Sequence, residues 1–123
     1  MIEKTLKDHL ASQLSDPVYL DVPANPGARY YKLERTGGSE EDHIRHATFA
    51  LQAIGPTLWE TLQMHYRGIE AMRQALRLPT VADVQLNADY NFTDTTRKQH
   101  RYPAVFYITH YEERKLWQLS LIH

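Results

Sequence analysis

The stretch from Val84 to Phe92 constrains the fold of this chain more than any other. Every second residue in it is apolar or aromatic, and the residues between them are polar. A period of two places one set of side chains on each face of a β-strand. The pattern therefore predicts a strand with one buried and one solvated face.

The same period recurs in other parts of the chain. It predicts a long, half-buried strand over residues 43–54, with Ala47, Phe49, Leu51 and Ala53 toward the core. Residues 102–111 are rich in Tyr, Phe, Val, Ile and Thr, which favours a hairpin partner for the strand ending at Phe92. Shorter strands are predicted over residues 18–22 and 29–35, and polar connections over residues 36–42 and 93–100.

Spacings of three and four residues predict two helices. The first runs from Ile2 through Leu14 and ends at the Ser-Asp-Pro sequence that follows. The second begins after Gly55-Pro56, where Thr57 and Glu60 form a capping-box sequence, and Pro79 closes it. Its expected apolar stripe consists of Leu58, Leu62, Tyr66, Ile69, Met72 and Leu76.

The order of these elements predicts a single α+β domain spanning residues 1–123. We expect an antiparallel sheet of mixed strand lengths with long hairpins, covered on one face by two helices. Residues 113–123 are apolar from Leu116 to Ile122 and are predicted to form a C-terminal edge strand or an arm. Long hairpins leave exposed strand edges, which favour pairing with copies of the same chain.

Composition excludes several functional classes. The formal net charge of -1 provides no global field for nucleic acid or anionic lipid. The chain has no cysteine, which excludes disulfides, thiolate zinc sites and cysteine nucleophiles. No apolar run approaches the roughly 20 residues that span a bilayer, so neither export nor membrane anchoring is expected.

Motifs for catalysis or metal binding are weak. His43 and His46 lie three apart, so on a strand they face opposite sides. The serines lack a nucleophile-elbow sequence, and three acids follow the Gly37-Gly38 pair, where they would repel phosphate. We expect no catalytic, cofactor-binding or metal-binding residues. A small metal-dependent hydrolase using His43, His46 and an acid of residues 40–42 stays an alternative, and a ligand-binding module is a further one.

Aromatic residues favour an interface. Eight tyrosines, two tryptophans and three phenylalanines exceed the needs of one small core, and aromatic residues are enriched at protein interfaces. Charged or glycine-rich connections flank the aromatic strands. The predicted interface residues are Tyr30, Tyr31, Gly37, Gly38, Glu40, Glu41, Asp42, Arg97, Lys98, Arg101, Tyr107 and Trp117.

Three segments carry a resemblance to a known family. They are residues 18–23, VYLDVP; residues 30–60, with Gly37-Gly38, the histidine-bearing strand and GPTLWE; and residues 101–111, RYPAVFYITHY. Together with the Ala71-Met72 helix they resemble the tail terminator, or tail completion, proteins among the minor tail proteins of siphophages and prophages. The resemblance covers residues 2–111, and the apolar residues 116–123 depart from the family pattern.

This resemblance implies a virion structural protein of the tail, present in the bacterial host cytoplasm before assembly. Such a subunit forms a six-membered ring that stops growth of the tail tube and supports head-tail joining. Its expected partners are copies of itself, the tail tube protein and head-completion proteins, while DNA only passes through the pore. No enzyme activity, cofactor, membrane or small-molecule substrate is implied. A head-tail connector or neck protein is the alternative within the virion.

Overall fold

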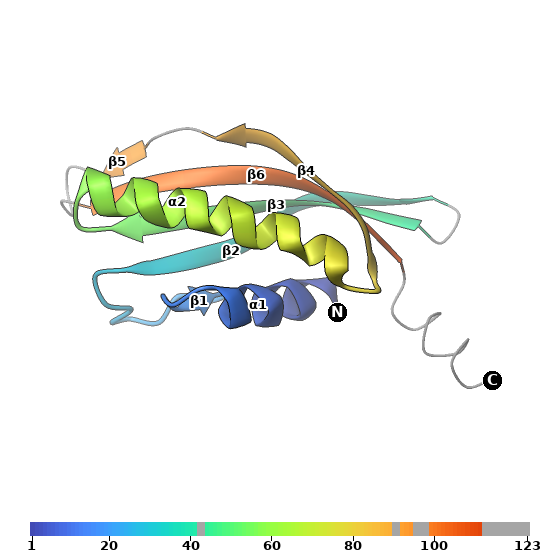
Figure 1. Cartoon of the computed structure of the whole chain (residues 1–123), viewed down its shortest axis with the longest axis horizontal. Coiled ribbons are helices and arrows are strands. Elements are labelled where there is room, and N and C mark those ends of the chain that lie inside the picture. Colours follow the sequence, from blue (N-terminus) through green and yellow to red (C-terminus); the bar gives the residue numbers. More distant parts are fainter. Residues whose placement is uncertain (42–43, 90–91, 95–98, 112–123) are drawn as a thin grey trace.

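One sheet and two helices make up the computed structural model, which describes residues 1–41, 44–89, 92–94 and 99–111. The helices are α1 (Ile2–Gln13) and α2 (Leu58–Arg73), and a short 3-10 helix, η1 (Gln74–Arg77), follows α2. The strands are β1 (Val18–Tyr19), β2 (Tyr30–Glu41), β3 (Ile44–Gly55), β4 (Val81–Asp89), β5 (Phe92–Asp94) and β6 (Gln99–Tyr111). Both helices lie on the same side of the sheet (Figure 1).

The strands are ordered β1-β2-β3-β6-β4, and β5 pairs with β6. The pairs within this sheet are antiparallel except β1 with β2, which is parallel. The central pair is β3 with β6, in which Ile44 lies opposite Tyr111 and Gly55 opposite His100. The predicted α+β class, with two helices on one face of a largely antiparallel sheet, is confirmed.

The core lies between the sheet and the helices. Ala47, Phe49, Leu51 and Ala53 alternate along β3 and are all buried, as the period of two predicted. On β6, Ala104, Phe106 and Ile108 continue this face. From α1 the core receives Ile2, Leu6 and Leu10. The sheet thus uses one face for the core and leaves the other uncovered by the helices.

Helix α2 begins as predicted but turns a different face to the sheet. The Glu60 backbone amide donates to Thr57 Oγ1 at 3.2 Å, which confirms the N-cap, and the Thr57 hydroxyl donates to the Glu60 carboxylate at 2.9 Å. The residues that α2 buries are Thr61, Met64, His65, Gly68, Ile69, Ala71 and Met72. Leu58, Tyr66 and Leu76 of the expected apolar stripe are 43%, 61% and 50% exposed, so that assignment is wrong for these three residues.

Small residues explain this choice of face. A Cβ on Gly68 would lie 3.0 Å from Leu51 Cδ2 and 3.1 Å from Tyr31 Cε1. Gly68 therefore lets the helix backbone approach the sheet closely. A face of larger side chains would hold α2 farther from Tyr31, whose hydroxyl donates to the Met64 carbonyl at 2.6 Å.

Two strand predictions need correction. Residues 36–41 were expected in a loop or hairpin tip, but they continue β2 and pair with β3, with a register shift between Arg35 and Gly37. The β3 backbone satisfies their hydrogen bonds although their side chains are polar. The strand expected over residues 18–22 is only Val18–Tyr19. Within the described residues, no helix is long and apolar enough to cross a membrane.

Candidate self-association surface

The face of the sheet away from the helices carries exposed aromatic and apolar side chains near the β2-β3 hairpin. Ile44, Tyr107 and Tyr111 are 38%, 47% and 42% exposed. Ile44 lies opposite Tyr111 in the register, and Thr48 lies opposite Tyr107. Side chains of β3 and β6 therefore combine into one surface, with a hollow of about 460 Å³ between His46, Thr48, Tyr107 and Thr109.

Two different strand edges of the described sheet have no strand beside them. Strand β1 covers β2 only opposite Tyr31 and Lys32, so β2 has a free edge from Leu33 to Glu41. At the other end of the sheet, β4 pairs with β6 alone. Unpaired edges are templates for another chain, although the charges of β2 and the register shifts of β4 restrict which chain fits.

The base of the β2-β3 hairpin is tied to α1 through Arg35. Its Nη1 lies 3.2 Å from Glu3 Oε1, and its Nε donates to the Gly37 carbonyl at 3.3 Å. A Cβ on Gly38 would lie 2.6 Å from Arg35 Nη2 and 2.7 Å from the His46 carbonyl oxygen. Because Gly38 has no side chain, the Arg35 side chain can pass over it. The ion pair of Arg35 with Glu3 then fixes the hairpin relative to α1.

The two adjacent glycines offer a matched test. Gly38→Ala is expected to lower the free energy of unfolding by about 1–2 kcal/mol, because the new methyl group meets a backbone oxygen that cannot move freely. Gly37→Ala is the control, since its Cβ would find no atom closer than 3.8 Å. Urea unfolding of both variants measures the difference. Equal losses would contradict the close approach at Gly38.

The predicted interface tyrosines divide between core and surface. Tyr30 and Tyr31 are 5% and 1% exposed, so the expectation that they present rings to a partner is wrong. Tyr31 points to α2, and its burial raises its pKa above the ordinary value of a tyrosine, whereas the Tyr30 ring lies 5.9 Å from the Tyr19 ring of β1. Tyr107 is accessible on the uncovered face. Trp117 lies outside the described residues.

Of the predicted charged residues, those that the structure describes lie at different ends of β3: Glu40 and Glu41 near Ile44, and Arg101 near Ile54. Glu40 Oε1 lies 3.9 Å from Arg45 Nε within the same hairpin, so its charge is partly compensated in the chain. Glu41 is the last residue of β2. Arg101 is a half-buried residue of β6, opposite Ile54, and not part of a solvated turn. Asp42, Arg97 and Lys98 lie outside the described residues.

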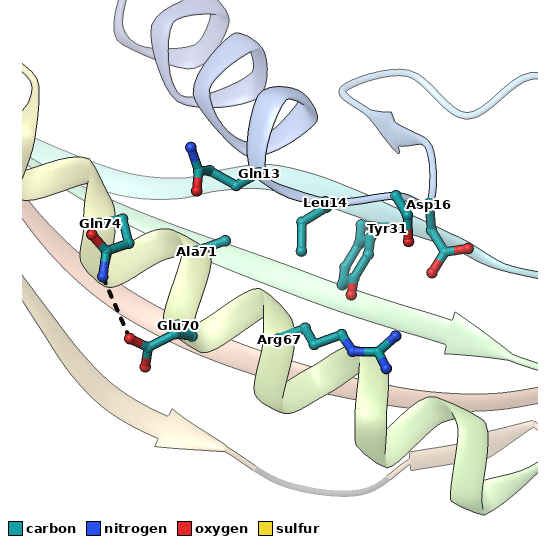
Figure 2. A pocket seen from close by; sticks show the side chains of 9 residues that line it. Gln13, Leu14, Asp16, Tyr31, Arg67, Glu70, Ala71 and Gln74 are labelled. Atoms are coloured by element: carbon teal, nitrogen blue, oxygen red, sulfur yellow. Dashed lines mark hydrogen bonds between the residues drawn. The ribbon is translucent and has the colours of Figure 1, made fainter.

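A cleft between the two helices is the other hollow of note. It has a volume of about 350 Å³ and lies over Tyr31. Figure 2 shows Arg67 and Glu70 of α2 and Gln74 of η1 along one wall, and Gln13 and Leu14 at the end of α1 across from them. Asp16, at the rim, is held by Arg29, whose Nη2 lies 3.1 Å from Asp16 Oδ2. Arg29 also reaches Glu60 at 3.2 Å and so ties the segment after α1 to the start of α2.

Three of the described histidines, His46, His65 and His110, lie on β3, α2 and β6. Among these residues, no group of three or more His, Asp or Glu side chains lies close enough together to hold a metal ion. His46 is exposed on the uncovered face, and its Nδ1 lies 3.3 Å from Thr109 Oγ1. His65 and His110 are buried. His43, the other half of the expected pair, lies outside the described residues.

Sequence reasoning missed an apolar stripe on the outer flank of α2, because Leu58, Leu62 and Tyr66 were assigned to the core and Trp59 was not assigned. The stripe consists of Leu58, Trp59, Leu62 and Tyr66, with Trp59 70% exposed. The competing signal was the row of small residues Gly68, Ala71 and Ala75, which recur at three- and four-residue spacing. Small residues at such spacing allow a helix to pack closely, so they mark the buried face better than large residues do.

No protein-family model matches the chain, and no curated protein matches it.

Proposed function

We propose that this protein is a structural subunit of a tailed-phage or prophage virion, similar to a tail terminator and not an enzyme. Copies associate head to tail into a ring that caps the tail tube and supports joining of the head. The ring pore passes DNA without reading its sequence. Two features support this role: the resemblance seen in the sequence, and the unpaired strand edges and uncovered face of the sheet.

The observation that carries this proposal is the pair of unlike free edges on β2 and β4. They lie at opposite ends of one sheet. If β2 of one copy pairs with β4 of the next, the contact is heterologous, and such contacts build rings or filaments instead of closed dimers. A terminator needs the ring, because every subunit edge in a closed ring is paired and no further copy can join it.

The uncovered face of the sheet supports the same role. Tyr107, Tyr111 and Ile44 expose apolar area beside a hairpin that extends past the helices (Figure 1). Tyrosine suits a surface that is wet before assembly and buried afterwards, because its ring is apolar and its hydroxyl still finds partners. We place the contact with the tail tube or with the next subunit on this face.

Electron microscopy of a lysate from a phage that lacks this gene tests the proposal. Overlong or headless tails beside filled heads are the expected result for a terminator. Tails of normal length with unjoined heads would move the role to a connector or neck protein. Intact, infectious virions would rule out both structural roles.

A further inference from the structure

The exposed stripe of α2 is a surface without a partner in the described part of the chain. Leu58, Trp59 and Tyr66 are 43%, 70% and 61% exposed, and Leu62 between them is half-buried. Leu62 lies four residues after Leu58 and three after Trp59, and Tyr66 lies four after Leu62, which places them on one flank of the helix. An apolar row of this kind on a soluble helix indicates a contact with another segment.

This flank faces away from the cleft between the helices. Arg67, Glu70 and Gln74 line the cleft and lie on the other flank (Figure 2). On the other side, the His65 ring contacts Tyr66 at 5.3 Å between centroids and Tyr102 of β6 at 4.1 Å. The stripe therefore adjoins aromatic rings that pack α2 against the sheet. An incoming segment would meet a helix surface that is held in place by this packing.

The chain itself contains a matching segment. Residues 116–122 read LWQLSLI, without a charge and with five large apolar residues. They lie outside the described residues. The stripe and this sequence are both apolar and without charge, so a contact between them would remove the exposed apolar area of the stripe from water.

Chain length decides which copy can bring Trp117 to the start of α2. Gly55, just before α2, lies opposite His100, whereas β6 ends at Tyr111. Eleven residues of strand carry the chain about 36 Å away from the start of α2. Trp117 follows Tyr111 by six residues, which span at most about 21 Å. A chain therefore cannot place its own Trp117 on its own Trp59, but a neighbouring copy can.

We propose that residues 116–122 of one copy dock on the Leu58, Trp59, Leu62 and Tyr66 stripe of the next copy, with Trp117 at Trp59. The contact rests on the self-association in the proposed function and specifies it further. Each copy gives one segment and receives one, so the contact is head to tail and compatible with a ring. It fastens neighbours through helix α2 in addition to any strand-edge pairing.

The absence of cysteine from the chain allows a direct test by disulfide trapping. A tagged full-length Trp59→Cys variant is mixed with an untagged Gln118→Cys variant under oxidising conditions, and mixed disulfides are followed by gel mobility. The control replaces Trp59→Cys with Asp8→Cys, on α1, whose side chain is 57% exposed. We expect mixed disulfides to form on the order of tenfold faster with Trp59→Cys, because docking raises the local thiol concentration.

Equal rates for the two cysteine positions would overturn the inference. So would a Trp59→Cys/Gln118→Cys double variant that forms its disulfide only within one chain. These results stand apart from the test of the proposed function, which depends on virion morphology. Overlong tails in the gene deletion together with failed trapping would retain the terminator role and remove this contact from it.

Discussion

Phe106→Ala is expected to lower the free energy of unfolding by about 3–5 kcal/mol. Phe106 is 0% exposed and lies between Phe49 of β3 and Leu86 of β4 in the register. Its removal leaves a cavity in the middle of the sheet, where both neighbouring strands are fixed by pairing and cannot close the gap. Chemical denaturation with a two-state fit measures the loss.

Tyr107→Ala is the matched control, one residue further along the same strand. Tyr107 points to the uncovered face and is 47% exposed, so the expected loss is within about 0.5 kcal/mol, as for most surface changes. Under the proposed function this variant also weakens assembly while it leaves the fold intact. Similar losses from both variants would mean that the two faces of β6 are equally buried, contrary to the structure.

The elements best predicted from sequence are those with a half-buried face. Strand β3 shows this clearly, because Ala47, Phe49, Leu51 and Ala53 are all buried, whereas Thr48 and Gln52 between them are only half-buried. Because one face of the strand is buried, apolar residues must occupy every second position. The strand can therefore be recognised from its own sequence. The same holds for α1, whose Ile2, Leu6 and Leu10 are all buried.

The elements predicted poorly depend on distant partners. Residues 36–41 contain no apolar residue, and only their pairing with β3 makes them a strand. Helix α2 offers two adjacent stripes at helical spacing, and hydrophobicity alone favoured the one with Leu58 and Tyr66. The sheet selected the stripe with Gly68, because close approach of the backbones matters more than the size of the side chains.

Residue type also failed to separate core from surface among the tyrosines. Tyr31 and Tyr107 both lie on strands, yet one is 1% exposed and the other 47%. The hydroxyl of Tyr31 is satisfied by the Met64 carbonyl, a residue 33 positions away in sequence. No local pattern reveals such a partner, so the sequence could propose an aromatic interface without locating its face.

Gly68→Val is expected to lower the free energy of unfolding by about 1–3 kcal/mol, although valine has the higher helix propensity of the two residues. The new side chain enters the space against Tyr31 and Leu51, where even a Cβ would lie at 3.1 and 3.0 Å. Relief requires α2 to move away from the sheet, which stretches the Tyr31 hydrogen bond to Met64. Thermal and chemical unfolding measure the change.

Arg67→Val is the control for the helix itself, because Arg67 is the exposed neighbour of Gly68 on α2. We expect it to change stability by no more than about 0.5 kcal/mol. A Leu51→Ala change should make Gly68→Val less costly, since it removes the nearest obstructing carbon, and a double-mutant cycle measures this coupling. Strictly additive losses would place Gly68 away from Leu51 and would remove the reason why α2 exposes its Leu58, Trp59 and Tyr66 stripe.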